Sequence, residues 1–434
     1  MAPEMESMSS LSALLTIINT NTQQLQSLYI EYGYQTPSLD APFHSSPLDT
    51  HVKALELSQL IVAAANNLIA IVRPPRATIR EFSSGMFQSA PVGFAVDVDI
   101  PEILDEAPNK ELHVKEIAMV ADCDSSHAAR ILRYLATRHI FREVTPDVFT
   151  NNRISSALIK SNGKTVAELK AKPLEKYDDS GLAAVVGCIT GDGLKSSSAL
   201  IDFLKSSGKA GTTPCNMAWG TDKSLFNWFS ESEDGWRMRR FMAHMKSRTK
   251  EFDSSIFQNA YTWQDLDPTD VVIDVGGNVG MVTLGIAKVF SKPKYVVQDL
   301  SSVMVEAKEV MSSSSNVHCD NTHPQPIKGA AVYFLRFIIH DWPDAKCIKI
   351  LRNIRDAASA SSKLILFEHV APYACEDVTE YEGKIERRRA PWPLVPNIGK
   401  DEGGPSDNKF GYASSFSRVP YRKLGAGSSN VNGV

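Results

Sequence analysis

Two short segments of this chain carry residues that could perform chemistry. Residues 271–280 read Val-Val-Ile-Asp-Val-Gly-Gly-Asn-Val-Gly, and His340-Asp341-Trp342 begins 60 residues after them. The first segment is typical of a buried strand that runs into a glycine turn able to hold a nucleoside-bearing cofactor. The second places an imidazole, which titrates near neutral pH, at the end of another apolar stretch. The pair indicates group transfer from a bound cofactor, with a histidine handling a proton.

The glycine turn gives a first indication of the cofactor. A ligand can approach the backbone closely only where side chains are missing, as they are at Gly276, Gly277 and Gly280. Asp274 adds a carboxylate under this turn, where it suits a cationic or amino group better than a pyrophosphate, which it would repel. The turn therefore favours a sulfonium or amino-acid-bearing cofactor over a dinucleotide. A tight turn of purely structural purpose is the alternative.

Two further carboxylates extend the predicted cofactor site. Asp299 ends the second predicted strand, 25 residues after Asp274, where a carboxylate offers two acceptors to a pair of ribose hydroxyls. Asp320 follows the next apolar position, Val317, and is a candidate neighbour of the adenine. A solvated carboxylate at a strand end or in a loop is the alternative for either residue.

His340 ends the predicted strand 332–339, and ligands of open parallel sheets bind beyond the carboxyl ends of the strands. Glu368 ends the next predicted strand, so we expect it beside His340, where a carboxylate orients the imidazole and stabilises its charged form. A packing or capping histidine is the alternative. Trp342 is more often a packing residue than a substrate contact.

Helical spacing of apolar residues dominates the first half of the chain. It predicts helices over 11–32 and 50–72 and a third from Pro75 to about Ser89. Residues 112–154 read as a helix, a second helix capped at Ser125-Ser126 and a small hairpin, which is the order of a winged-helix unit. The second of these helices lacks an extended basic face, which argues against DNA binding.

Alternating strands and helices begin near residue 270. Apolar strands at 271–275, 295–298, 331–335 and 363–368 alternate with helical patterns at 279–290, 302–311 and 345–358. Units of this length predict a parallel sheet with crossover helices, hence an α/β fold. We expect five segments: a helical N-terminal region (1–111), the winged-helix-like unit (112–155), a second helical region (156–267), the cofactor-binding sheet (268–400) and an irregular tail (401–434).

Composition excludes several classes of protein. The 434 residues carry a net charge of −4, without the concentrated positive field of a nucleic-acid binder. The six cysteines form no C-x-x-C motif and fit free thiols in a reducing compartment. The acidic N-terminus lacks the basic start of a signal peptide, and the apolar run 60–72, broken by Asn66-Asn67, is too short to span a bilayer. We therefore expect a cytoplasmic protein with no membrane or nucleic-acid partner.

Together these motifs resemble the S-adenosyl-methionine-dependent O-methyltransferases of the caffeate and flavonoid type. The resemblance rests on segment 112–154, the turn 274–277, Asp299-Leu300 and the stretch from Phe334 through His340-Asp341-Trp342, and it spans roughly residues 50–374. It implies a Rossmann-like methyltransferase sheet that binds S-adenosyl-methionine. It also implies a mainly helical N-terminal half that forms a homodimer and part of the pocket for a small hydroxylated acceptor.

The resemblance also assigns roles to residues. Gly276 and Gly277 would lie against the methionine part of the cofactor, Asp299 would bind the ribose, and Asp320 with Asn321 would border the adenine. Asp274, Gly280, Leu300 and Arg336 complete the expected cofactor site. His340 would be the general base, supported by Glu368, and Phe241, Met245, Asp341 and Trp342 would contact the acceptor. No metal is expected, because no ligand cluster suggests one.

The chain departs from the family pattern in two places. Asn278 stands where many relatives have a further glycine, a mild change because Asn tolerates left-handed backbone. A second carboxylate usually flanks the catalytic histidine, within a Gly-Lys-Glu-Arg-Thr-like segment, and Gly383-Lys384-Ile385-Glu386-Arg387 lies too early to supply it. Gly, Ser, Asn and Pro make up half of residues 401–434, which predicts irregular structure. The alternative function is therefore a catalytically impaired relative that acts as a dimerisation partner or scaffold.

Overall fold

The computed structural model describes residues 9–206, 212–250, 257–299, 303–304, 325–342, 344–368, 374–375 and 390–398. By tertiary contacts these residues form two units. The first contains the chain up to Lys172 with the described residues after Ala371, and the second runs from Pro173 to Val370. The finer division into five segments stays a prediction.

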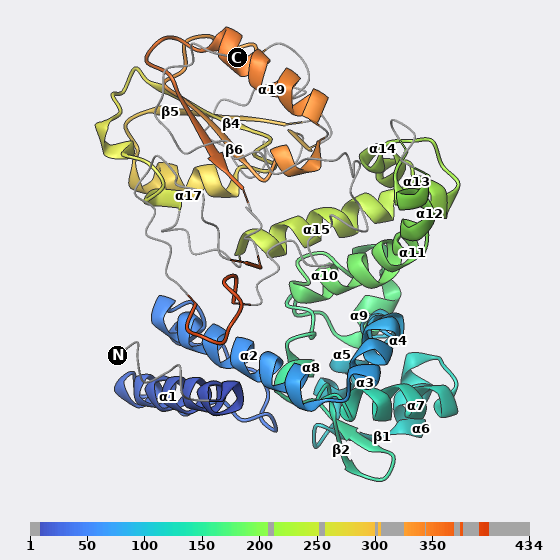
Figure 1. The fold of residues 1–434 in the computed structure, drawn as a ribbon. Helices are drawn as coiled ribbons and strands as arrows, with labels where there is room; N and C mark the ends of the chain where they lie inside the picture. Colours follow the sequence, from blue (N-terminus) through green and yellow to red (C-terminus); the bar gives the residue numbers. More distant parts are fainter. Residues whose placement is uncertain are drawn as a thin grey trace. The chain divides into compact units, whose positions relative to one another are not determined.

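Two long helices open the first unit and pack against each other (Figure 1). Helix α1 (Ser10–Glu31) starts at Ser9, whose side chain accepts the Ser12 N–H, and α2 (Val52–Val72) follows a loop as predicted. Leu14 near the start of α1 packs with Ala63 and Ala64 in the second half of α2, and Tyr29 near its end packs with Ala54 near the start of α2, so the helices run antiparallel.

The predicted third helix is two helices. Helix α3 (Pro75–Ser83) ends at Ser84, and α4 (Met86–Asp97) follows after Gly85 and contains Pro91. Small and turn-forming residues interrupt the pattern at 84–85 although apolar residues continue on both sides. A short helix α5 (Ile100–Glu106) begins after Asp99, whose backbone is left-handed (φ 62°).

The segment predicted to be winged-helix-like contains a small antiparallel sheet of order β1-β3-β2. Its elements are β1 (Glu111–His113), α6 (Val114–Ala121), α7 (Ser125–Ala136), β2 (Arg142–Thr145) and β3 (Val148–Thr150). Helix α7 is capped by the Asp124 carboxylate, which accepts the N–H groups of Ser126 and His127, and not by the serine pair that the sequence favoured. The order of helices and hairpin is as predicted, and the winged-helix classification stays a prediction.

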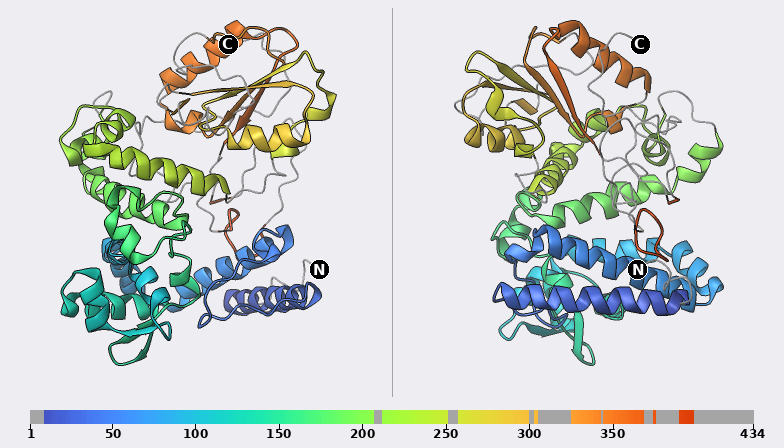
Figure 2. Two further views of the ribbon diagram at one scale, coloured as in Figure 1. Left: turned by 180° about the vertical axis from the view of Figure 1, so that it is seen from behind. Right: turned by 60° about the vertical axis from the view of Figure 1, so that its left-hand side comes forward.

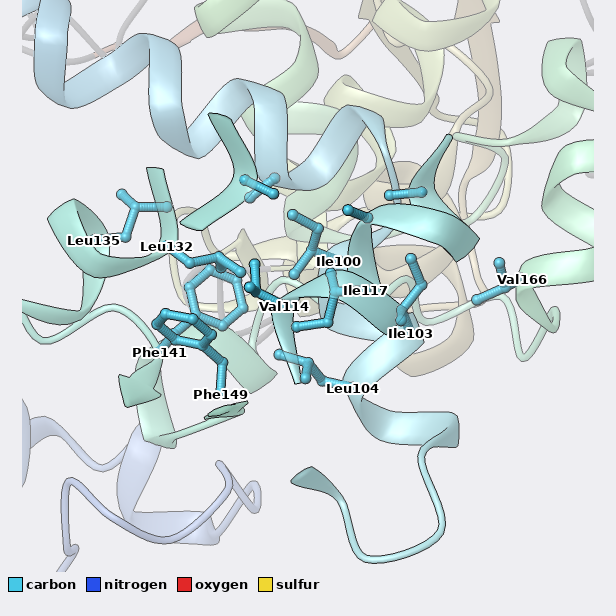
Figure 3. Close-up of a cluster of buried hydrophobic side chains, with 14 residues drawn as sticks. Ile100, Ile103, Leu104, Val114, Ile117, Leu132, Leu135, Phe141, Phe149 and Val166 are labelled. Carbon is cyan, nitrogen blue, oxygen red and sulfur yellow. The ribbon is translucent and has the colours of Figure 1, made fainter. Parts of the chain in front are cut away.

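A core of fourteen buried side chains joins α4 to α7 and the small sheet. Figure 3 shows the rings of Phe141 and Phe149 meeting below Leu132, with Val114 and Ile117 beside them. Helices α8 (Arg153–Ser156) and α9 (Val166–Ala171) close this part of the unit.

One fully buried lysine ties the start of α5 to the segment after α8. The Lys160 Nζ donates to Asp99 Oδ1 (2.8 Å) and to Glu102 Oε1 (3.3 Å), and all three side chains are at most 4% exposed. Two carboxylates so far from water are tolerable only because the ammonium compensates them.

Short helices begin the second unit. They are α10 (Leu182–Cys188), a π-helical turn (Ile189–Gly193), α11 (Leu194–Ser197), α12 (Leu200–Lys205), α13 (Pro214–Trp219), α14 (Leu225–Ser230) and the longer α15 (Trp236–Lys250). A 3-10 turn at Trp263–Asp265 leads into the sheet. Trp263 is fully buried there, and its indole N–H donates to the Phe257 carbonyl.

The described sheet has four parallel strands in the order β5-β4-β6-β7. They are β4 (Val271–Val275), β5 (Lys294–Gln298), β6 (Val332–Arg336) and β7 (Lys363–Phe367), all close to the predicted ranges. Their continuous apolar character fits strands covered on both faces. Helix α17 (Met281–Val289) packs through Ile286 on one face, and α19 (Asp344–Ala357) packs through Ile350 and Ile354 on the other (Figures 1 and 2).

The strand order creates a switch point beside β4. The chain passes from β4 to β5 on one side and later places β6 on the other side of β4. Loops that leave the carboxyl ends of β4 and β6 therefore diverge, and such a crevice is where open α/β sheets bind ligands.

Helix α2 qualifies, by length and composition alone, as a helix that could cross a membrane, with 21 residues and few charges. The helix continues through Asn66-Asn67 and is therefore longer than the apolar run 60–72 that was expected to be too short to span a bilayer. Part of α2 packs on α1, and 17% of its apolar window is buried in the protein.

Candidate active site

The residues predicted to do chemistry follow four neighbouring strands at the same edge of the sheet. Parallel register pairs Val275 with Gln298 and Arg336 with Phe367, so the strand ends are level. The glycine turn follows β4, Asp299 follows β5, the His340 turn follows β6 and Glu368 follows β7. The sheet thus brings together residues that are up to about 95 positions apart in the sequence.

The glycine turn is held against the end of β5. The N–H groups of Gly276 and Gly277 both donate to the Gln298 carbonyl, at 2.7 and 3.3 Å. Gly276 (φ 77°), Asn278 (φ 52°) and Gly280 (φ 79°) have left-handed backbone. The asparagine accepts this conformation, as expected, and its Oδ1 also accepts the Val279 N–H at 2.7 Å.

Gly277 is needed for a reason that the sequence did not reveal. A Cβ at this position would lie 2.5 Å from Asp274 Oδ2 and 2.9 Å from Val297 Cγ1. Real Cβ atoms essentially never come so close to other atoms. The missing side chain therefore makes room for the Asp274 carboxylate beneath the turn, whatever ligand lies above it.

Asp274 is a buried carboxylate, 3% exposed. Burial raises the pKa of Asp274 to about 6, because a charge removed from water is disfavoured. The hydrogen bond from the Thr283 hydroxyl and the positive charge of Arg336 oppose this rise. A buried carboxylate of this kind gains most from a neighbouring cation, so the site fits a cofactor that carries an ammonium or sulfonium group.

Asp299 lies next to the same turn. Its Oδ2 accepts the Asn278 N–H at 2.7 Å, which fixes one carboxylate oxygen against the backbone. Arg336 ends β6, with its guanidinium carbon 5.3 Å from the centre of the Phe257 ring and 4.8 Å from that of Phe337. The predicted cofactor residues Leu300, Asp320 and Asn321 lie outside the described residues.

His340 does not end a strand, as the sequence led us to expect. Strand β6 ends at Arg336, Phe337 has left-handed backbone (φ 55°), and His340 sits in a 3-10 turn (Ile339–Asp341). The apolar run 337–339 continues the pattern of a strand but forms the loop that carries the histidine. This places the imidazole beyond the sheet edge, at the switch point.

The predicted neighbour of His340 is present. The Nδ1 of His340 lies 2.7 Å from Glu368 Oε2. The other carboxylate oxygen, Oε1, accepts the N–H groups of Ile338 and Ile339 at 2.8 and 2.7 Å. An ionised carboxylate only accepts, so the proton of a neutral imidazole lies on Nδ1 and Nε2 is left as the basic atom.

A second carboxylate reaches His340 from its immediate neighbour. Asp341 Oδ1 lies 3.3 Å from His340 Nε2, and the Asp341 side chain is 46% exposed. The sequence placed Asp341 at the acceptor and offered no second carboxylate for the histidine. A contact between adjacent residues of a 3-10 turn cannot be foreseen while the segment is taken to be a strand.

The predicted acceptor residues have different surroundings. Phe241 is 9% exposed and packs with Phe229, and Met245 is partly buried in the same cluster. Trp342 is partly buried in the cluster beneath α19, in agreement with the packing alternative. Met242, a further candidate for the pocket wall on α15, packs with Val279 of the glycine turn and with Met304.

Among the residues that the structure describes, no group of three or more His, Cys, Asp and Glu side chains is placed to hold a metal ion.

Comparison with known proteins gives consistent matches for both halves of the chain. Residues 200–385 match the O-methyltransferase domain, and residues 81–161 match the O-methyltransferase dimerisation domain. The 4-O-methyltransferase 1 of Phanerochaete chrysosporium is 33% identical, over 90% of this chain and 87% of that protein.

More distant matches extend the range of relatives. Sterigmatocystin 8-O-methyltransferase of Aspergillus parasiticus is 27% identical, over 84% of this chain and 83% of that protein. The solved structure of LepI in complex with SAM superimposes with a TM-score of 0.58 at 19% identity, over 81% of this chain and 82% of that one. This last likeness concerns the fold.

Proposed function

Because the chain belongs to the S-adenosyl-methionine-dependent O-methyltransferases, we propose that it methylates a hydroxyl of a small aromatic or polyketide-like secondary metabolite, with His340 as general base. The single observation that carries the proposal is the position of the imidazole. His340 sits past β6 at the switch point, hydrogen-bonded through Nδ1 to Glu368.

S-adenosyl-methionine, the cofactor of this family, supplies a methyl group already activated by its sulfonium. The chain's part is to hold and align, which is worth several orders of magnitude in rate when the reacting atoms are placed well. Asp274 and Arg336 would lie near the charged amino-acid end of the cofactor, and Asp299 would hold the ribose. The glycine turn 276–280 would follow the cofactor backbone.

His340 would take the hydroxyl proton of the acceptor on Nε2. Glu368 supports this role in two ways, since it fixes the tautomer with the proton on Nδ1 and stabilises the imidazolium that forms. Its own position is set by two backbone N–H groups, so it is oriented before any ligand arrives. Asp341, now 3.3 Å from Nε2, has to turn away before an acceptor can reach that nitrogen, and its exposure allows this.

The acceptor class is supported by the names of relatives, among them a sterigmatocystin 8-O-methyltransferase. Apolar and sulfur-containing side chains of α15, Phe241 and Met245, are proposed as part of the acceptor wall. The match of residues 81–161 to a dimerisation domain supports a homodimer. We propose that the protein acts in the cytoplasm.

Calorimetry with S-adenosyl-methionine, followed by methyl transfer to a phenol panel, tests the proposal. A suitable panel is catechol, 2-methoxyphenol and 1,8-dihydroxyanthraquinone, with the formation of S-adenosyl-homocysteine as the readout. His340→Ala should leave the dissociation constant of the cofactor within about 3-fold and lower turnover by roughly 10²–10⁴-fold. Unchanged turnover would refute the role of His340 as a base.

Cofactor binding without methyl transfer to any hydroxylated acceptor would favour the alternative of an impaired relative that serves as a dimerisation partner. The Glu368–His340 pair, which such a relative has no reason to keep in working geometry, favours the enzyme.

A further inference from the structure

Four basic residues of α15 are joined to the segment before the helix by ion pairs. They are Arg237 and Arg240 with Asp192 (3.2 and 2.8 Å), Arg239 with Asp178 (2.5 Å) and Lys246 with Asp179 (2.6 Å). The pairs at Asp178 and Asp179 are exposed to solvent, and exposed ion pairs contribute little to stability. The two at Asp192 are different, because the Asp192 side chain is 4% exposed and receives a separate guanidinium on each oxygen.

Aromatic rings immobilise the first of these guanidinium groups. The guanidinium carbon of Arg237 lies 4.4 Å from the ring centres of Trp228 and Trp236 and 4.9 Å from that of Trp219. Cation–π contacts on several sides hold an arginine whose hydrogen bond already points at Asp192.

The second guanidinium lies close to the backbone of the π-helical turn. Asp192 belongs to the π-helical turn Ile189–Gly193, and a Cβ at Gly191 would lie 3.2 Å from Arg240 Nη2. A π-turn is rare and costs helix regularity. In this turn both Asp192 and Gly191, which has no side chain, lie next to Arg240.

The next turn of α15 reaches the predicted cofactor site. Met242, two residues after Arg240, packs with Val279 of the glycine turn and with Met304. Phe241 and Met245 flank it and pack with Phe229. One rigid helix therefore connects the clamp at Asp192 with the wall proposed for the acceptor and with the turn proposed for the methyl donor.

We propose that Asp192 is a positioning residue for methyl transfer, which holds α15 so that the acceptor wall stays in register with the glycine turn. The inference rests on the proposed function, since it takes Phe241 and Met245 as acceptor contacts. Asp192 itself touches neither ligand in this scheme. It acts through Arg237 and Arg240, and errors of about 1 Å in such alignment cost up to roughly 100-fold in rate.

The test is Asp192→Asn, with Asp178→Asn as matched control. Each change removes one carboxylate charge that pairs with α15, but only the first is buried. Asp192→Asn should lower kcat on the responsive phenol by roughly 10- to 100-fold while the dissociation constant of S-adenosyl-methionine changes by less than about 3-fold. Asp178→Asn should change neither by more than about 2-fold.

Arg237→Lys covers the case in which Asp192→Asn does not fold. It keeps a charge near Asp192 but gives up the guanidinium that lies against three indole rings, so kcat should again fall more than cofactor affinity. Equal loss of kcat and cofactor affinity, or wild-type kcat in folded Asp192→Asn, would overturn the proposal in favour of a purely structural role.

Failure of the proposed function is recognisable separately. If the wild type methylates none of the panel, the proposed function fails this test and turnover cannot report on Asp192, so hydrogen exchange then tests the role of α15. Asp192→Asn should speed amide exchange in residues 237–247 and around Val279, and Asp178→Asn should not. Unchanged exchange in Asp192→Asn would overturn the coupling whatever the acceptor is.

Discussion

Lowering the pH from 7 to 5 should weaken the binding of S-adenosyl-methionine by roughly ten-fold through protonation of a single buried carboxyl. Burial raises the pKa of Asp274 to about 6, and the ionised form is the one that attracts a cation. With that pKa, about nine-tenths of the carboxyl is ionised at pH 7 and about one-tenth at pH 5. The amino and carboxyl groups of the cofactor keep their charges over this range.

The same carboxyl makes the cofactor-free protein less stable at neutral pH. Its pKa is raised on folding, so the folded state holds the proton more tightly, and stability falls as pH rises from about 4 to about 6. A rise from 3.8 to about 6 corresponds to at most about 3 kcal/mol in the free energy of unfolding. Asp274→Asn should therefore raise the melting temperature of the cofactor-free protein at pH 7 while it weakens cofactor binding.

Calorimetric titrations at pH 5, 6 and 7 provide the assay. The change of affinity with pH should disappear in Asp274→Asn and persist in His340→Ala, which serves as the control because it removes the imidazole of the site and keeps Asp274. An affinity of the wild type that does not change with pH, or the same slope in Asp274→Asn, would refute the assignment of this carboxyl to the cation.

Four further outcomes are expected. Gly277→Ala should lose cofactor affinity by more than about 10-fold and cost roughly 1–3 kcal/mol of stability, because the new methyl group meets the carboxylate below it; near-wild-type calorimetry would contradict this. Glu368→Gln keeps an oxygen for the backbone N–H groups but loses the charge, so turnover should drop at least about 10-fold without a change in cofactor affinity, measured by steady-state kinetics. Lys160→Met leaves two buried carboxylates uncompensated and should cost about 3–5 kcal/mol in urea denaturation; a loss below about 1 kcal/mol would argue against that compensation. Burial raises the pKa of the Cys188 thiol to about 12, so a thiol reagent at pH 8 should label the exposed Cys375 and spare Cys188 in the native protein.

The parallel sheet was predictable because its strands are uninterrupted apolar runs between glycine, proline and polar segments. Val271–Val275 and Lys363–Phe367 were located to within a residue or so on that basis. The loop after β6 was not predictable, since Phe337 to Ile339 are apolar and give no sign that the strand has ended. Strand β6 ends because Phe337 has left-handed backbone and because Glu368, which follows β7, accepts the N–H groups of Ile338 and Ile339.

The contacts that organise α15 were also beyond sequence reasoning. Asp192 lies 45 positions before Arg237, and Asp178 lies 61 before Arg239. Charges so far apart look like ordinary surface residues until the helices are packed. Residue types at the strand ends, in contrast, were informative, because the edge where parallel strands finish is fixed by the fold class alone.

The steric relation of Gly277 to Asp274 and Val297 has an evolutionary consequence. A Cβ at position 277 collides with the side chains at 274 and 297, so the order in which the three positions can be substituted is constrained. Homologues with alanine at position 277 should carry a smaller residue at 274 or 297, acquired earlier in the lineage. A lineage that made such an exchange at 274 would give up the buried charge, and with it the dependence on pH, before it gained any freedom in the turn.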